Sequence, residues 1–139
     1  MLKSILLAAV LIAFSAPAFA DQDNLDHGIT DAVKTYKKGG AKALQTRAEL
    51  CYSGIPYKHA DHEQAANKAE YCFAYEIAAT TIIQQTTRKD ITQGYFFPSD
   101  VLIRGAYNAE RAGLITDPSE FGDYMSPRMT YVTTNVPTL

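Results

Sequence analysis

The segment 61–86, DHEQAANKAEYCFAYEIAATTIIQQT, constrains the fold most, because it is apolar around most of a helical circumference. One stripe of small and apolar residues recurs at helical intervals, and a second stripe widens it. The first comprises Ala65, Ala69, Cys72, Tyr75 or Glu76, Ala79 and Ile83, and the second comprises Phe73, Ala74, Ile77, Ala78 and Ile82. A helix of this kind usually lies at the centre of a domain. We therefore predict a central helix here, with Asp61 as its N-terminal cap.

Glycines divide the part of the chain before this helix. We expect residues 21–28 to be a loose polar leader. A short helix is predicted from Thr30 to the glycine pair Gly39-Gly40, which favours a left-handed helix end. A second helix is predicted from about Ala41 to Cys51, where small and apolar residues recur every three or four positions.

Proline and capping residues organise the part that follows. Ser99 is expected to cap a third helix that ends at Gly113. Asp117-Pro118 and Ser126-Pro127 each predict the start of a further short helix. The expected inward face of the third helix consists of Leu102, Ile103, Ala106, Tyr107 and Ala109. No stretch alternates with period two for long enough to demand a sheet, so the predicted fold is all-α, a small single-domain bundle of about four to five helices.

The first twenty residues have the pattern of an export signal. Lys3 precedes an apolar run, and Ala18-Phe19-Ala20 is an A-x-A cleavage signature. The apolar run is shorter than the roughly 20 residues that span a bilayer. We expect a signal peptide over 1–20, cleaved after Ala20, and a single domain over 21–139. The mature protein would then lie in the periplasm without a membrane anchor.

Charge and motifs argue against several classes of function. The formal net charge of −2 gives no basic footprint of the kind that nucleic-acid binding needs. The only basic cluster, Lys34, Lys37 and Lys38, is short and lies beside Asp31. The sequence contains no G-x-S-x-G elbow, no glycine-rich phosphate loop after a strand and no C-x-x-C-H haem site. We expect neither an enzyme nor a bound cofactor.

The two cysteines favour a disulfide over a metal site. Cys51, His59, His62 and Cys72 offer two sulfurs and two imidazoles, but they lack the closely spaced cysteine pair of a zinc module. An even number of cysteines in an exported chain indicates oxidation. We predict one disulfide, Cys51–Cys72, between the end of one helix and the middle of the central helix. A partial metal or acid–base site at His59, Asp61 and His62 stays open as an alternative.

Two other side chains stand out. A carboxylate at Glu76, among apolar neighbours in the central helix, would be costly to bury without a partner, and Arg104 is a candidate partner. An exposed position for Glu76 at the edge of the helix is the alternative. Tyr95, in the aromatic group Tyr95-Phe96-Phe97, either packs in the core or anchors a protein partner.

Three short motifs resemble those of the Rap/Tai-type immunity proteins of bacterial type VI secretion. They are L-C-x-S at Leu50–Ser53, Y-C-F-A-Y-E-I-A at Tyr71–Ala78 and F-F-P-S-D-V at Phe96–Val101. The resemblance covers about residues 41–138. Many relatives carry a second cysteine pair where this chain has Phe96 and Thr138, and a glycine where it has Ala78.

The resemblance implies a periplasmic immunity protein that performs no chemistry. Such a protein binds a secreted peptidoglycan amidase of the papain-like cysteine type and blocks its active-site cleft, often with a loop of an immunity dimer. It leaves a homodimer open for this chain. Two loops, 52–62 and 86–95, are candidate contacts, and we favour the second. The candidate partner-binding residues are Arg88, Lys89, Asp90, Gln93, Tyr95, Tyr57 and His59. The alternatives are a small disulfide-stabilised periplasmic chaperone or stress protein and a metal-binding protein.

Overall fold

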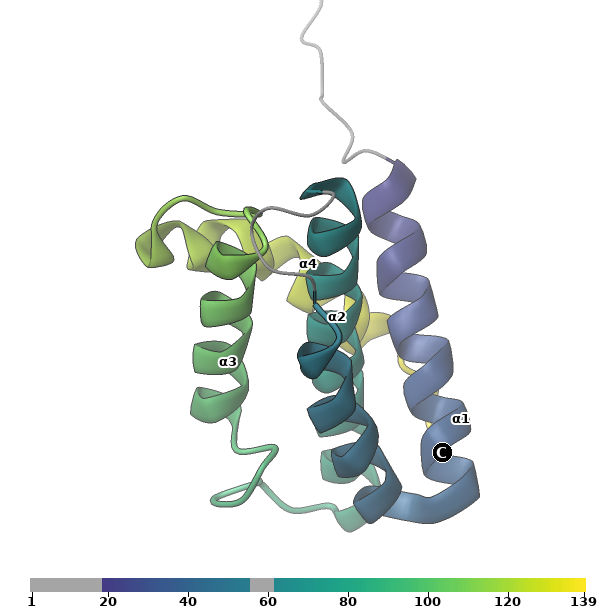
Figure 1. Ribbon diagram of the computed structural model, residues 1–139. Coiled ribbons are helices and arrows are strands. Elements are labelled where there is room, and N and C mark those ends of the chain that lie inside the picture. The colour runs from purple at the N-terminus through teal and green to yellow at the C-terminus, as the bar shows by residue number, and fades with distance from the viewer. Residues whose placement is uncertain (1–18, 56–61) are drawn as a thin grey trace, which may run out of the picture.

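The computed structural model describes residues 19–55 and 62–139, and their backbone is helical apart from short connections (Figure 1). The helices are α1 (Phe19–Ser53), α2 (His62–Thr87), α3 (Pro98–Arg111) and α4 (Phe121–Asn135). A short 3-10 turn, η1 (Pro118–Glu120), precedes α4. The described ranges contain no strand. The prediction of a small all-α bundle is confirmed. Residues 1–18, most of the predicted signal peptide, lie outside the described ranges.

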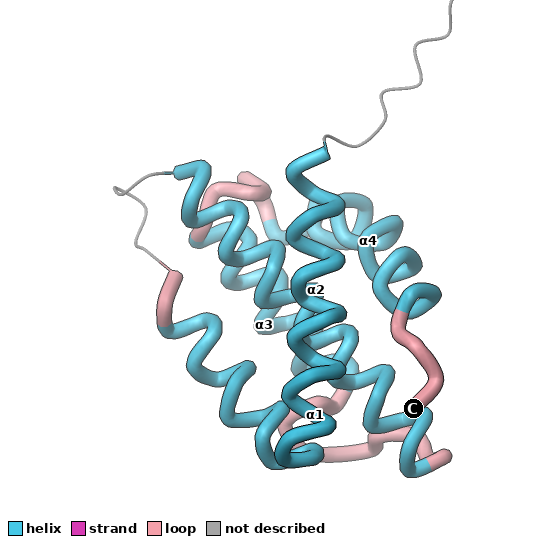
Figure 2. The backbone as a smooth tube through the Cα atoms, turned by 90° about the vertical axis from the view of Figure 1, so that its right-hand side faces the viewer, coloured by secondary structure: helices cyan, strands magenta, loops and turns pink. Residues whose placement is uncertain are grey.

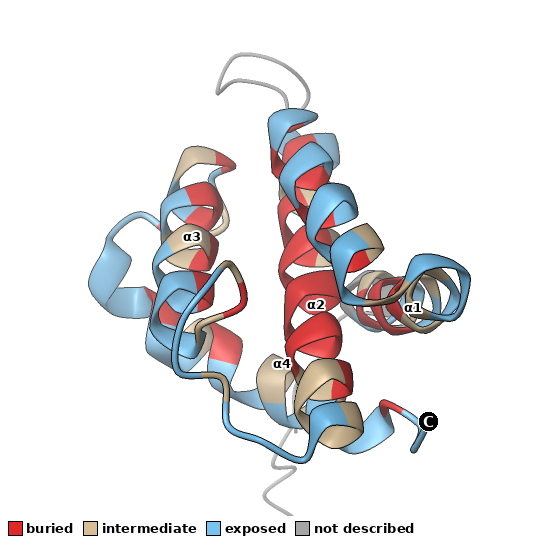
Figure 3. Cartoon of the chain, turned by 90° about the horizontal axis from the view of Figure 1, so that it is seen from below, coloured by how far each residue is buried: buried red, intermediate tan, exposed pale blue. Residues whose placement is uncertain are grey.

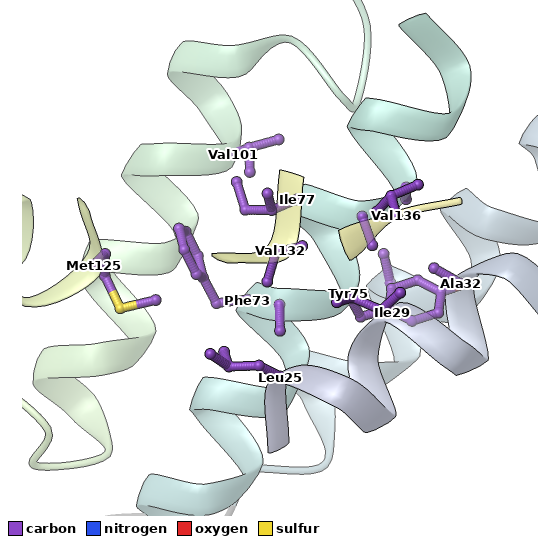
Figure 4. Close-up of a cluster of buried hydrophobic side chains, with 14 of the residues drawn as sticks. Leu25, Ile29, Ala32, Phe73, Tyr75, Ile77, Val101, Met125, Val132 and Val136 are labelled. Atoms are coloured by element: carbon purple, nitrogen blue, oxygen red, sulfur yellow. The ribbon is translucent and has the colours of Figure 1, made fainter. Parts of the chain in front are cut away.

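Helix α2 lies at the centre, as predicted, with α1 and α3 on its two sides (Figure 3). Its buried positions run without interruption from Cys72 to Thr80. The core brings α2 together with side chains from the other three helices, as Figure 4 shows for Leu25 and Ile29 of α1, Val101 of α3, and Met125 and Val132 of α4. No helix in the described ranges combines the length and hydropathy that a membrane span requires.

The glycine pair Gly39-Gly40 interrupts α1, as predicted. Gly40 has φ +64°, in the left-handed region that favours glycine, and both residues have non-helical backbone angles. The chain changes direction sharply at this point (Figure 2). The first segment, 19–38, and the second, 41–53, therefore pack on α2 at different angles.

The expectation of a loose leader over 21–28 was wrong, because these residues belong to the first segment of α1. Leu25, Ile29 and Ala32 are buried at helical spacing and contribute to the core. Because only these few apolar residues mark the buried face, the polar composition of the segment led to the wrong prediction. Gly28 lies directly against α2, where an added Cβ would come within 2.8 Å of the Cβ of Ala74.

Helix α3 presents a different face to the core from the predicted one, and only Ala109 of the predicted inward residues is buried. Its buried residues are Val101, Gly105, Asn108 and Ala109, whereas Leu102, Ile103 and Tyr107 are exposed and Ala106 is half-buried. Gly105 explains this orientation, because a Cβ there would clash with the ring of Phe73. The predicted Ser99 cap was also wrong: Phe97 occupies that position without a side-chain hydrogen bond, and Pro98 begins the helix. Gly113 closes the helix as predicted, with φ +78°.

The C-terminal part confirms one predicted helix start and corrects the other. The Asp117 carboxylate accepts a hydrogen bond from the backbone N–H of Ser119 at 2.8 Å and caps η1. Ser126-Pro127 does not begin a helix, since Pro127 lies inside α4. Phe121 and Met125, buried one helical turn apart, start α4 earlier. Their burial outweighs the backbone hydrogen bond that Pro127 cannot make.

Candidate partner-binding site

The predicted disulfide links the last turn of α1 to α2. Cys51 and Cys72 are both buried and bonded, with their Cα atoms 5.7 Å apart. Their sulfurs are therefore not available as thiolate ligands. Of the alternative metal residues, His62 is exposed at the start of α2, while His59 and Asp61 lie outside the described residues. Within the described ranges, no three His, Cys, Asp or Glu side chains are grouped so that they could hold a metal ion.

Glu76 is completely buried and has the partner that the sequence suggested. The guanidinium of Arg104 donates to its carboxylate, with Nε 3.1 Å and Nη2 3.0 Å from Oε1. The hydroxyl of Tyr52 donates to Oε2 at 3.0 Å. Burial raises the pKa of the Glu76 carboxyl above its ordinary value, while Arg104 acts in the opposite direction. The group thus joins α1, α2 and α3 through one carboxylate.

Arg104 also fixes the end of the connection between α2 and α3. Its Nη2 donates to the backbone carbonyl of Tyr95 at 2.6 Å, and its guanidinium carbon lies 3.9 Å from the centre of the Tyr95 ring. Burial raises the pKa of the Tyr95 hydroxyl. Tyr95 is half-buried and packs on the core, whereas its neighbour Phe96 is buried. Tyr95 is therefore an anchor of the loop rather than an isolated exposed ring.

The connection itself, residues 88–95, is the candidate contact loop. Arg88, Lys89, Asp90 and Gln93 are all exposed. Arg88 adopts a left-handed backbone, φ +53°, and so ends α2 abruptly. Tyr57 and His59, the other two predicted contact residues, lie outside the described residues.

A hollow of about 240 Å³ adjoins this loop, and we call it the loop hollow. It brings Gln93 and Tyr95 together, whereas Arg88, Lys89 and Asp90 do not line it. Residues of α1 and α2 that the sequence did not point to complete its wall. The lining residues are Ala41, Lys42, Gln45, Ile83, Ile91, Gln93, Tyr95 and Phe96. The lining combines apolar and polar side chains, which suits a side chain of a protein partner.

A second buried carboxylate, Glu70, was missed from the sequence. It accepts hydrogen bonds from Tyr124 Oη at 2.6 Å, Arg128 Nε at 2.8 Å and Asn24 Nδ2 at 3.0 Å. Glu70 therefore ties both α1 and α4 to α2. The available signal was its position three residues before Phe73, which places it on the same buried face of the helix.

Comparison with known proteins adds no relative to this picture. The resemblance to immunity proteins therefore depends on the three short motifs alone. The first two motifs contain Cys51 and Cys72, which form the disulfide, and the third contains Pro98, which begins α3. The chain matches no protein-family model, no curated protein and no solved structure.

Proposed function

We propose that this chain is a periplasmic immunity protein that binds a type VI secreted peptidoglycan amidase and blocks its active-site cleft. The observation that carries the proposal is the attachment of the exposed loop 88–95 to the buried Glu76–Arg104 pair through Tyr95. An inhibitor needs a contact loop that is already ordered, because ordering it on binding would reduce the affinity. The Arg104 bonds supply that order at one end of the loop.

The rest of the scaffold supports the same role. Cys51–Cys72 and the hydrogen bonds of Glu70 hold α1 and α4 on α2. A disulfide suits an oxidising compartment such as the periplasm, which agrees with the signal peptide expected over 1–20. In this proposal the protein has no catalytic residues, and the loop hollow receives a side chain from the rim of the amidase cleft.

The test is inhibition of the amidase encoded beside this gene, measured as the release of peptides from purified peptidoglycan. The unmodified protein should inhibit the enzyme at near-equal molar ratio. The double variant Lys89→Glu/Gln93→Ala changes the loop without touching the core. We expect it to weaken inhibition about tenfold or more, a loss of about 1.4 kcal/mol in binding.

The matched control is Lys37→Glu/Thr134→Ala, which makes the same change in charge at exposed positions on α1 and α4. It should inhibit as well as the unmodified protein. Equal weakening by both double variants would show that the loop is not the contact. If no cell-wall hydrolase is encoded nearby, or no such amidase is inhibited, the proposed function is wrong.

One observation favours the alternative of a periplasmic chaperone. Leu102, Ile103 and Tyr107 form an exposed apolar face on α3, of the kind that can bind an unfolded client. A chaperone of this class is expected to loosen in acid. Client aggregation and circular dichroism near pH 3 separate the two functions. Retention of the fold without protection of a client rejects the chaperone.

A further inference from the structure

The bend of α1 encloses a second pocket, of about 220 Å³, on the molecular surface. One wall of the pocket is a face of the first segment of α1, residues 19–38. Arg47, from the second segment, residues 41–53, forms the opposite wall. The lining residues are Asp31, Lys34, Thr35, Lys38 and Arg47. The change of direction at Gly39-Gly40, visible in Figure 2, is what brings the two segments face to face.

The pocket is positive on a chain whose formal net charge is negative. Lys34, Lys38 and Arg47 supply three cations, against the single carboxylate of Asp31. The side chains of Lys34 and Lys38 lie one helical turn apart on the same face. An anion seated there would meet charges from both segments of α1.

Arg47 is only partly engaged within the protein. Its Nη2 lies 3.7 Å from Oδ2 of Asp31, well beyond the roughly 2.8 Å of a charge-assisted hydrogen bond. Asp31 is bound more closely by the hydroxyl of Tyr71, at 2.6 Å, and the same hydroxyl also interacts with the guanidinium of Arg47. The Arg47 side chain is 55% exposed, and a guanidinium carries five N–H donors. It therefore retains donors for a carboxylate.

The positive surface continues beyond the pocket. A smaller hollow of about 80 Å³ shares Arg47 with it and is also lined by Leu50, Cys51, Lys68 and Tyr71. Leu50 is 64% exposed, so the continuation adds an apolar contact beside the charges. The pocket and the smaller hollow together form the cationic groove. Because two hollows share Arg47, the groove offers contacts to more than one group of a bound chain.

We propose that the cationic groove binds an acidic segment of a partner protein, with carboxylates between Lys34, Lys38 and Arg47 and an apolar side chain near Leu50. The three cations outnumber Asp31, so the pocket attracts anions, and the exposed apolar Leu50 beside it favours a peptide segment over a free phosphate ion. The groove and the loop hollow flank the second segment of α1 on different sides, since Lys42 and Gln45 line one and Arg47 and Leu50 line the other. The proposal thus does not depend on the amidase.

The test is fluorescence anisotropy of a labelled peptide, Glu-Glu-Leu-Glu-Glu, titrated with the purified full chain at low salt. The peptide Gln-Gln-Leu-Gln-Gln tests the need for charge, and inorganic phosphate is titrated as a competitor. The variants are Lys38→Gln and Arg47→Gln. Their matched control is Lys37→Gln, which removes the same charge from the neighbouring exposed position outside the groove.

We expect the acidic peptide to bind and the glutamine peptide not to bind. Lys38→Gln and Arg47→Gln should each weaken binding about threefold, and Lys37→Gln should leave it unchanged. Equal weakening by Lys37→Gln would show that only the overall charge attracts the peptide and would overturn the proposal. Phosphate binding without peptide binding, or no binding of either, would overturn it as well. Because Lys38 is exposed and outside the core, its variant answers the question even if Arg47→Gln disturbs the fold.

Discussion

At the scale of single residues, the core contains buried polar groups that have opposite effects on the stability of the fold. Glu76 and Glu70 are buried, and each is bonded to an arginine and a tyrosine. Tyr75 is also buried, but its hydroxyl, which lies near the side chain of Thr35, makes no hydrogen bond of ordinary geometry among the described residues. Burial raises its pKa to about 12. A satisfied buried group stabilises the fold modestly, whereas an unsatisfied one destabilises it.

The pair Tyr52→Phe and Tyr75→Phe tests this contrast with the same chemical change. Tyr52→Phe removes a donor from the buried carboxylate of Glu76 and should lower the free energy of unfolding by about 1–3 kcal/mol. Tyr75→Phe removes the unsatisfied hydroxyl and should leave stability unchanged or raise it by about 1 kcal/mol. Urea unfolding followed by circular dichroism measures both. A larger loss for Tyr75→Phe than for Tyr52→Phe would contradict the assignment.

The burial of Glu76 also predicts that the free energy of unfolding depends on pH. Its pKa is raised in the folded protein by burial, so the folded state holds the proton to a higher pH than the unfolded chain does. The stabilisation by the neutral carboxyl is therefore complete below the ordinary value of 4.5 and is lost as the pH rises through the raised pKa. Glu76→Gln lacks this titration. The difference in free energy of unfolding, unmodified minus variant, should fall with rising pH over that window, and an increase would refute the sign.

At the scale of helices, close approach depends on residues without side chains. Gly28 lets α1 contact the backbone of α2 at Tyr75, and Gly105 lets α3 contact the ring of Phe73. These contacts set which face of each helix is buried. They are invisible to a count of apolar residues, because a glycine contributes nothing to hydrophobic periodicity.

Gly28→Ala tests the approach of α1 to α2. The new Cβ would lie 2.8 Å from the Cβ of Ala74 and from the backbone nitrogen of Tyr75, so the helices must separate. We expect a loss of about 1–3 kcal/mol in the free energy of unfolding. Gly122→Ala is the control, since its Cβ would meet nothing within 4 Å and should stabilise α4 by up to about 1 kcal/mol. Stabilisation by both changes would show that α1 and α2 are not in close contact.

These contacts also explain what the sequence could and could not predict. The central helix, the bend at Gly39-Gly40 and the disulfide follow from local signals. The start of α1 could not be predicted from local signals, because Leu25 and Ile29 lie among polar residues. The prediction of the inward face of α3 was wrong because the larger apolar residues Leu102 and Ile103 outweighed Gly105 in the hydrophobic pattern. Of the candidate site, the exposure of the loop was predictable, whereas the hollow beside it depends on how α1 and α2 pack.

At the scale of the whole molecule, the second segment of α1 is the part on which both surfaces depend. The loop hollow and the cationic groove flank it, and residues 41–53 hold both in place. This segment is secured to α2 by the disulfide and by the bond of Tyr52 to Glu76, and its buried Leu44 and Ala48 belong to the main core. Around the disulfide lies a small apolar cluster, separate from the main core, of Cys51, Tyr52, Ile55, Ala65, Ala69, Cys72 and Ala112.

Removal of the disulfide should therefore act mainly on one part of the molecule. The double variant Cys51→Ala/Cys72→Ala opens a loop with a sequence separation of 21 residues and is expected to lower the free energy of unfolding by about 3 kcal/mol. Hydrogen exchange should show the amides of 41–53 opening more readily, while those of the buried centre of α2, 73–82, open only with global unfolding. Chemical reduction of the unmodified protein serves as the matched control and should give the same pattern. An equal increase in exchange over all helices, with no excess in 41–53, would mean that the main core rather than the disulfide holds this segment.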